Sequence, residues 1–293
     1  MTSTATISFE LSQHALQARR NAKWNQYDAD VMPAFVADMD FAVAAPIQAA
    51  IERIVRERDY GYPLRNGEKA DRLVANAFAK RMQSLYGWEL SPDLVMPLAD
   101  LVQGTYAPIL AFSDPGDGVV LQVPNYPPFR DAINTSERKL LALPMRDDGS
   151  RYVFDMTELK RLVDKRTRIF TLCNPQNPTG RVFSRDELLA LGQFAIERDL
   201  IVISDEIHSD LVFPGQQHIP FASLGREIAA RTHPQLRDQE FQHSRSSLRA
   251  HRLRLRGVAQ PLSQAHPAQA NRSAQYRRRR RNGRRLDGMP ALA

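Results

Sequence analysis

Short apolar stretches of the strand type alternate with amphipathic helical stretches between residues 93 and 206 of the 293-residue chain. The apolar stretches are nearly continuous in Val, Ile and Leu, which is typical of strands that are buried on both faces. This alternation predicts an α/β fold, in which a mostly parallel sheet is covered by helices on both faces. The expected strands are residues 93–99, 117–124, 139–145, 168–175 and 200–206, and the expected helices among them are 100–112, 155–164 and 184–199.

The segments on either side of this alternation are organised differently. Residues 46–59 and 68–87 place apolar side chains at helical spacing, and the Gly- and Pro-containing stretch 60–67 between them predicts a loop. An early helix is expected within residues 10–20 of an otherwise extended beginning. We therefore expect three regions: an N-terminal arm or part of a small domain (1–44), a large domain (45–232) and a separate tail (233–293).

The tail differs from the rest of the chain in its charge. Residues 233–293 hold 14 arginines, no lysine and 3 acidic residues, which leaves 26 basic and 30 acidic residues elsewhere. The net charge of +7 therefore comes from the tail alone. An arginine-rich run such as "YRRRRRNGRR" is typical of nucleic-acid binding, and this function predicts a salt-dependent affinity that is lost when residues 233–293 are deleted.

The remaining composition narrows the class of protein. The apolar fraction of 43% is that of a globular protein, no apolar run is long enough to span a bilayer, and no signal-peptide pattern is present. The single cysteine, Cys173, excludes an internal disulfide and fits a reducing cytoplasm. We expect a cytoplasmic protein with neither a membrane partner nor a metal site.

Polar clusters follow the apolar stretches where ligands bind in parallel sheets, beyond the carboxyl ends of the strands. "CNPQNPTG" (173–180) predicts a rigid loop that aims Asn174 and Asn177 at one place, and an ordinary turn is the alternative. Asp205, in "SDEIH" (204–208), emerges from a buried strand, where a carboxylate needs a partner. Its alternatives are a helix cap and a structural ion pair, and the alternative for His208 is a structural histidine.

Two further segments complete a candidate site. The prolines of "VPNYPPF" (123–129) fix the direction of Tyr126, which can stack on a flat ligand or be a core aromatic. The helix that starts after Asp100 presents free backbone N–H groups, which suit a phosphate. With an asparagine for a ring oxygen and an aspartate for a ring N–H⁺, these residues predict a site for a flat, phosphorylated, cationic heterocycle.

Several segments resemble the pyridoxal-phosphate-dependent class I/II aminotransferase superfamily (fold type I). They are "KWNQYDADVMPAFVADMDF", "YGYP", "VPNYPPF", "CNPQNPTGRVFSRDEL" and "SDEIHSDLVFPGQQHIPFASL". "VADMDF", "YPPF" and "SDEIH" are similar to the MalY/PatB-type cystathionine β-lyases (C–S lyases) in particular, and the resemblance covers residues 8–232. It implies pyridoxal 5'-phosphate as the cofactor and a homodimer that releases thiol, pyruvate and ammonia from cystathionine or other cysteine S-conjugates. An aminotransferase is the alternative within the superfamily.

The resemblance also implies a role for each matching residue. Asp205 pairs with the pyridinium nitrogen, Asn177 bonds the phenolic oxygen with His208 beside it, and Tyr126 stacks on the ring. The phosphate is bound by the backbone N–H groups of Leu101 and Val102 and by Tyr62 of the neighbouring subunit. The substrate entrance is lined by the stretch that contains Ala37 and Asp38.

The lysine that forms the Schiff base in this superfamily is expected in a Ser-x-x-Lys-Ser-Phe-type motif, yet no lysine follows Lys165. When codons for residues 233–248 are read one nucleotide later, they permit the string T-L-N-S-A-T-K-S-F-N-I-P-G-L-R, with its lysine across Gln239 and Glu240. This predicts a frameshift at or just after Thr232 and an out-of-frame, disordered tail with no specific nucleic-acid partner. The chain is then expected to lack the last strands of the sheet, the C-terminal small domain, the substrate-carboxylate arginine and lyase activity.

Overall fold

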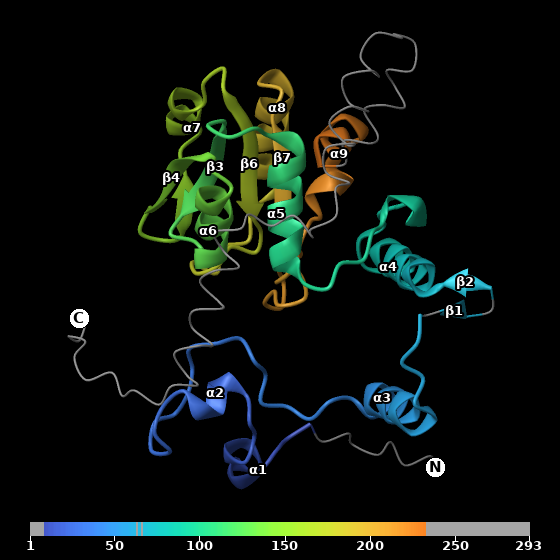
Figure 1. Ribbon diagram of the computed structural model, residues 1–293. Helices are drawn as coiled ribbons and strands as arrows, with labels where there is room; N and C mark the ends of the chain where they lie inside the picture. Colours follow the sequence, from blue (N-terminus) through green and yellow to red (C-terminus); the bar gives the residue numbers. More distant parts are fainter. Residues whose placement is uncertain (1–8, 63, 66, 233–293) are drawn as a thin grey trace, which may run out of the picture. The chain divides into compact units, whose positions relative to one another are not determined.

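The computed structural model describes residues 9–62, 64–65 and 67–232, and the predicted tail at 233–293 lies outside the described residues. The chain divides into two compact units, Met1–Leu73 and Val74–Ala293 (Figure 1). Helix α4 (Ala70–Tyr86) begins in the first unit and continues into the second.

The second unit is built on a five-stranded sheet with the strand order β5-β4-β3-β6-β7. Its strands are β3 (Gly118–Val123), β4 (Lys139–Asp147), β5 (Tyr152–Phe154), β6 (Thr167–Cys173) and β7 (Ile201–Asp205). Strands β4, β3, β6 and β7 run parallel, and only β5 pairs antiparallel, with β4. The expected mostly parallel sheet is therefore confirmed.

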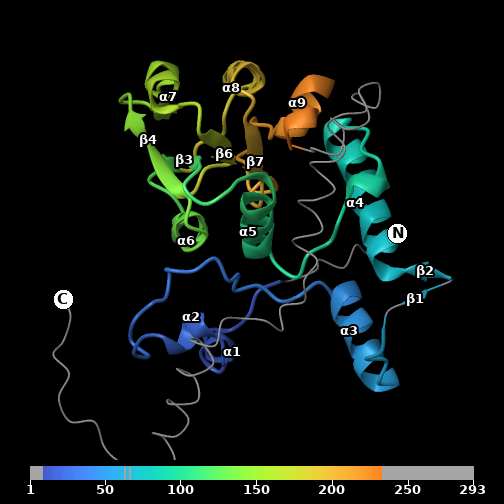
Figure 2. The same ribbon diagram turned by 45° about the horizontal axis from the view of Figure 1, so that its top comes forward.

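Helices cover both faces of this sheet (Figure 2). The helices α5 (Leu101–Phe112) and α6 (Pro127–Thr135) pack on one face, and α7 (Met156–Leu162) and α8 (Arg185–Glu197) pack on the other. The two faces follow from strand geometry, because successive side chains of a strand point to opposite sides. Thus Val119 and Leu121 pack with α5 and α6, whereas Val120 between them packs with α7 and α8.

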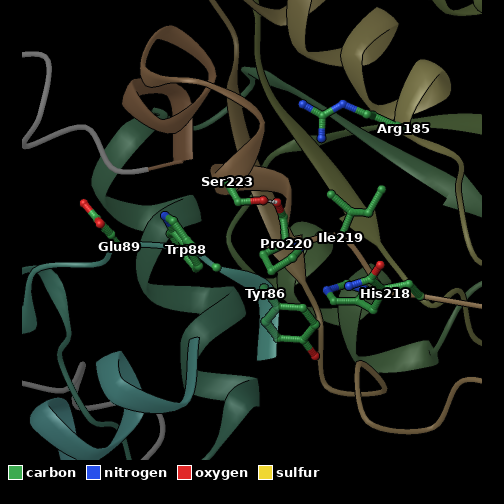
Figure 3. A pocket seen from close by; sticks show the side chains of 10 residues that line it. Tyr86, Trp88, Glu89, Arg185, His218, Ile219, Pro220 and Ser223 are labelled. Carbon is green, nitrogen blue, oxygen red and sulfur yellow. Dashed lines mark hydrogen bonds between the residues drawn. The ribbon is translucent and has the colours of Figure 1, made fainter. Parts of the chain in front are cut away.

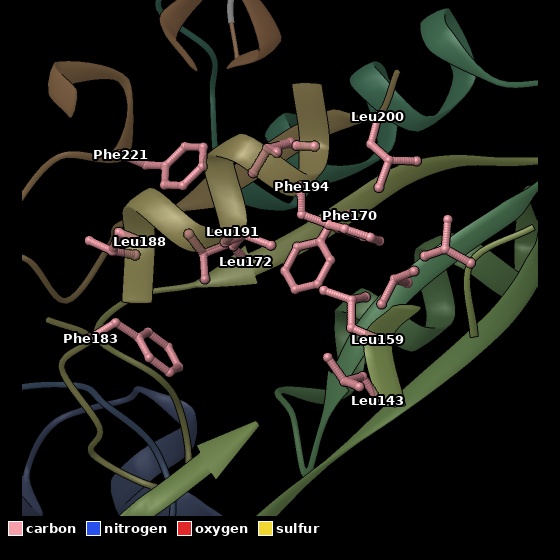
Figure 4. Close-up of a cluster of buried hydrophobic side chains, with 14 of the residues drawn as sticks. Leu143, Leu159, Phe170, Leu172, Phe183, Leu188, Leu191, Phe194, Leu200 and Phe221 are labelled. Atoms are coloured by element: carbon pink, nitrogen blue, oxygen red, sulfur yellow. The ribbon is translucent and has the colours of Figure 1, made fainter. Parts of the chain in front are cut away.

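The larger of the two apolar clusters lies between the sheet and α7 and α8 (Figure 4). Phe170 and Leu172 of β6 and Leu191 of α8 are fully buried there. Removing a side chain of this size from water stabilises the fold by about 1.5–3 kcal/mol. This cluster therefore fixes the spacing between α8 and the strands whose ends carry the polar motifs.

Side-chain caps set the starts of α5, α7 and α8. The Asp100 carboxylate accepts a hydrogen bond from the N–H of Gln103 at 2.9 Å. Asp155 caps α7, and Ser184 and Glu187 form a capping box at the start of α8. Because a cap satisfies backbone N–H groups that have no partner inside the helix, each of these residues fixes where its helix begins.

The sequence predictions for residues 93–99 and 60–67 are wrong. Residues 93–99 form no strand: the 3-10 turn η1 (Pro92–Leu94) occupies their start, and Met96 and Leu98 are exposed. A strand needs a hydrogen-bonded neighbour, and no described residue of the second unit pairs with this apolar run as a strand. Residues 60–67, predicted as a loop, contain β1 (Leu64–Arg65), which pairs antiparallel with β2 (Glu68–Lys69).

The segment after β7 packs on α8 and β7 and ends the described part of the chain. It contains η2 (Phe221–Leu224) and α9 (Arg226–Thr232). Gly192 of α8 permits the close approach of α9, because a Cβ at that position would lie 2.6 Å from Ile228 Cδ1. Neither element was predicted, and the same holds for α6 and β5.

The first unit has little regular structure besides α3 (Ala45–Glu57), which starts beside Pro46 as predicted. Two short helices, α1 (Gln13–Gln17) and α2 (Ala22–Asn25), precede it, and the first lies within the stretch predicted as helical. Lys23 organises the stretch before α3, because its ammonium lies 2.7 Å from both the Asp40 carboxylate and the Asp38 carbonyl oxygen. Within the described residues, no helix has the length and apolarity that crossing a membrane requires.

Candidate functional site

Asp205 ends β7 at the carboxyl edge of the sheet, and its side chain has few partners. Its Oδ1 accepts a hydrogen bond from the N–H of Ile207 at 3.0 Å, and its carbonyl oxygen accepts one from the N–H of Asn174. Burial raises the pKa of this carboxyl, while the Ile207 N–H and the nearby His208 act to lower it. In the described part of the chain no ion pair compensates this carboxylate, so it is suited to a cationic ligand.

The alternation along β7 shows which face Asp205 serves. Ile201 and Ile203 pack against the α5 and α6 side of the sheet, so Asp205, two positions further, points to that side as well. Its register partner Cys173 belongs to the same cluster. Burial raises the pKa of the Cys173 thiol to about 11, so at neutral pH the thiol stays protonated and adds no charge beside Asp205.

The first turns of α5 and α6 lie at this edge and on this face. The opposite end of α5 is at the amino edge, because Arg138, just before β4, donates hydrogen bonds to Oγ and the carbonyl oxygen of Ser113, the C-terminal cap of α5. Leu101 and Val102 are the first two residues of α5, so their N–H groups have no acceptor within the helix. Tyr126 immediately precedes α6, is 47% exposed, and meets Phe129 edge-on.

The two asparagines of the loop after β6 have different surroundings. Asn174 is fully buried, and its Oδ1 accepts a hydrogen bond from the N–H of Phe183 at 3.1 Å, so it supports the loop from within. Asn177 is partly buried, and among the described residues only its backbone is bonded, toward Cys173, so its side-chain amide is the one that can reach a ligand. The expectation that both asparagines point at one place is therefore wrong for Asn174.

Gln176 is a site residue that the sequence did not single out. It is 2% exposed; its Nε2 donates to the carbonyl oxygen of Pro124 at 2.7 Å, and its Oε1 accepts from the N–H of Thr179 at 2.9 Å. It therefore ties the loop after β6 to the loop after β3, and so brings the neighbourhoods of Asn177 and Tyr126 together. The only available signal was its place between two Asn-Pro pairs.

The second unit thus brings Leu101, Val102, Tyr126, Asn177, Asp205 and His208 to one edge of the sheet. Tyr62, Ala37 and Asp38 belong to the first unit, where Tyr62 is fully exposed and Asp38 accepts a hydrogen bond from Asn21. Gln239 and Glu240 lie outside the described residues. No group of three or more His, Cys, Asp or Glu in residues 9–232, as far as they are described, could hold a metal ion.

The fold and this edge define an α/β protein with a candidate ligand site at the carboxyl ends of its parallel strands. Residues 45–255 match the model of the family "Aminotransferase class I and II", and the chain belongs to this family of enzymes. The match extends past Thr232, the last described residue.

Three relatives show which members of this family the chain is similar to. The chain is 35% identical over 216 residues to cystathionine beta-lyase PatB of Bacillus subtilis, covering 72% of this chain and 54% of PatB. The structure of cystalysin from Treponema denticola, which contains pyridoxal 5'-phosphate, aligns with a TM-score of 0.68 and 29% identity over 76% of this chain and 57% of cystalysin. N-succinyldiaminopimelate aminotransferase of Mycobacterium tuberculosis aligns less closely, with a TM-score of 0.56, 27% identity and coverages of 61% and 46%. The chain therefore spans about half the length of the curated relatives that it matches.

Proposed function

We propose that this chain carries the cofactor-binding half of a pyridoxal-phosphate-dependent C–S β-lyase. The observation that supports this most is the Asp205 carboxylate, which is held at the carboxyl edge without an ion pair among the described residues. A protonated pyridine nitrogen would be that partner, and the ion pair would offset the cost of burying the carboxylate. Pyridoxal phosphate, when bound, supplies an electron sink for the carbanion that forms at the α-carbon of an amino-acid substrate.

The other residues of the edge fit the remaining parts of such a cofactor. The N–H groups of Leu101 and Val102 would donate hydrogen bonds to the phosphate at the positive end of α5. The exposed ring of Tyr126 would stack on the flat heterocycle, and the Asn177 amide would donate to its phenolic oxygen. His208 would lie beside that oxygen. Each side chain or N–H group thereby binds or orients one part of the ligand.

The substrate side of the site is proposed from the family and the relatives. Cystathionine or another cysteine S-conjugate would enter past the stretch that holds Ala37 and Asp38, and Tyr62 would reach the phosphate bound by a second copy of the chain in a cytoplasmic homodimer. We propose that the 293-residue chain binds the cofactor without catalysing elimination, because the sequence has no lysine after Lys165 to move the proton. An aminotransferase is the second candidate, since one of the aligned structures is an aminotransferase.

A ligand that needs no lysine tests the proposed site directly. Pyridoxamine 5'-phosphate carries the ring, the phosphate and an amine, and it binds without a covalent bond to the protein. We expect the purified chain to bind it and to release no pyruvate from cystathionine. The proposal is wrong if the chain does not bind pyridoxamine 5'-phosphate. It is also wrong if inorganic phosphate does not displace bound pyridoxamine 5'-phosphate from the chain. In a chain that carries the lysine, pyruvate release without a 2-oxo acid acceptor identifies a lyase, and dependence on such an acceptor identifies an aminotransferase.

A further inference from the structure

Glu206, the residue after Asp205, directs its carboxylate to the opposite face of the sheet. Its Oε1 accepts hydrogen bonds from the Ser204 hydroxyl and from the N–H of Phe221, both at 2.8 Å. Its Oε2 lies 3.1 Å from Nε2 of His218. A carboxylate offers only acceptors, so all three neighbours act as donors and Nε2 carries a hydrogen atom.

His218 is buried on this opposite face, and nothing in the proposed function uses it. Its side chain is 1% exposed, and its ring meets Tyr86 edge-on with centroids 5.6 Å apart. Figure 3 shows the ring beside Ile219 and Pro220 in the wall of a cavity of about 640 Å³. Nδ1 has no hydrogen-bond partner among the described atoms, so Glu206 holds the ring through Nε2 alone.

This arrangement fixes the direction of Asp205. Ser204 and Glu206 are two positions apart at the end of β7 and are joined by a hydrogen bond, so both point to the face covered by α8. Asp205 between them must then point to the other face, where Tyr126 and the first turn of α5 lie. Turning Asp205 away would break the bonds of Glu206 to Ser204, His218 and Phe221 together.

The pair also links the strand end to the segment that follows it. Phe221 begins η2 and is fully buried in the larger apolar cluster. The N–H group that donates a hydrogen bond to Glu206 therefore belongs to the core. His218 lies in the preceding stretch and is held by Tyr86 of α4. The carboxylate of Glu206 is therefore held by residues that belong to three different parts of the second unit.

We propose that Glu206 and His218 form a positioning pair, which holds Asp205 toward the cofactor site from the opposite face of the sheet. The inference rests on the proposed function and adds two residues that do not touch the cofactor. Partners that orient metal-ligating side chains from behind change affinity by about 10- to 100-fold when they are removed, and we expect the lower end of this range for a pair that orients a carboxylate.

The test compares His218→Leu, which removes the donor at similar volume, with His218→Gln, whose amide N–H can reach Glu206. For each variant we would measure the affinity for pyridoxamine 5'-phosphate, well below the melting temperature, and the absorption band that reports protonation of the bound ring nitrogen. We expect His218→Leu to lose about tenfold in affinity and part of the protonated band, and His218→Gln to keep both. A His218→Leu variant that melts lower but keeps the parent's affinity and band would overturn the proposal, because the pair would then be merely structural.

A milder variant keeps the test decisive if His218→Leu does not fold. Ser204→Ala removes one of the three donors to Glu206, and we expect it to fold and to lose about two- to fivefold in affinity, in line with one lost hydrogen bond of about 0.5–1 kcal/mol. An unchanged affinity in Ser204→Ala would count against the positioning pair. Failure of the proposed function looks different: the parent chain itself would not bind the probe, or Asp205→Asn would bind it as well as the parent.

Discussion

Asp205→Asn should stabilise the cofactor-free chain and weaken its binding of the cofactor at the same time. The amide has the shape of the carboxylate, and its Oδ1 can still accept the hydrogen bond from Ile207. Burial raises the pKa of Asp205 above the ordinary 3.8. At a pH between the ordinary pKa and the raised pKa, the folded chain therefore holds more protons than the unfolded chain. The free energy of unfolding therefore falls as the pH rises through this window and stays lower above it. The amide has no charge to bury, so the variant should melt higher than the parent at neutral pH.

Binding should change in the opposite direction. The carboxylate would make a charge-assisted hydrogen bond to a protonated ring nitrogen, and such bonds contribute about 1.5–3 kcal/mol. Since about 1.4 kcal/mol corresponds to a factor of ten, the dissociation constant of pyridoxamine 5'-phosphate should rise by about 10- to 150-fold.

Two measurements on the same preparations check this prediction. Thermal melts followed by circular dichroism, between pH 4 and pH 7, give the stability, and an absorbance titration gives the affinity. Asp210→Asn is the matched control, because Asp210 lies five residues away, is largely exposed and pairs with Arg81. It should neither raise the melting temperature nor reduce the affinity. If Asp205→Asn melts below the parent at pH 7, or binds the probe equally well, then Asp205 is a structural aspartate and the reasoning is refuted.

Three further substitutions test the packing and the caps. Gly192→Ala should lower the free energy of unfolding in urea titrations, because overpacking against Ile228 costs about 1–3 kcal/mol and the better helix propensity of alanine offsets only about 1 kcal/mol. Adding Ile228→Ala should restore part of the lost stability. If the effects of the two substitutions are fully additive, the contact between the two positions is contradicted. Lys23→Met removes the cation beside Asp40, whose pKa is lowered chiefly by its hydrogen bond with Lys23, so limited proteolysis within residues 36–41 should become faster; an unchanged cleavage rate would show that Lys23 does not hold this stretch. Ser184→Ala should lower the free energy of unfolding by about 1 kcal/mol, and no change in urea would mean that the capping box adds no net stability.

Among the helices, those that the sequence predicts well have both a periodic pattern and a local start signal. Asp100 and Ser184 stand at the start of the predicted helices 100–112 and 184–199, and in the structure both side chains cap their helices. Residues 93–99 have an apolar pattern but no such second signal, and the pattern alone does not reveal whether a neighbouring strand exists. Strand pairing depends on residues far away in the chain, which is why this prediction is wrong.

The candidate site divides in the same way. Asp205 and Tyr126 can be proposed from the sequence because a polar or aromatic residue follows a buried strand, which is a local pattern. The bonds of Gln176 to Pro124 and of Glu206 to His218 join residues that are distant in sequence, and only folding brings them together. The sequence can therefore nominate side chains for a ligand site, whereas the distant contacts that hold these side chains in place are seen only in the structure.

The missing lysine makes the reading frame after Thr232 the most consequential prediction. Inserting or deleting the nucleotide that restores the shifted frame should yield a chain with Ser-Ala-Thr-Lys-Ser-Phe in place of residues that include Gln239 and Glu240. That chain should retain pyridoxal 5'-phosphate through dialysis, and borohydride reduction should increase its mass by that of the attached cofactor. The 293-residue chain should lose the cofactor on dialysis, because no lysine follows Lys165 to bind it covalently. Carrying Asp205→Asn into the restored chain separates the two contributions: covalent attachment should persist, and the protonated absorption band should weaken. If the restored chain retains no cofactor although it folds, the similarity of the shifted string to the family's lysine segment is accidental, and the arginine-rich tail has to be judged as a nucleic-acid-binding segment by its salt-dependent affinity.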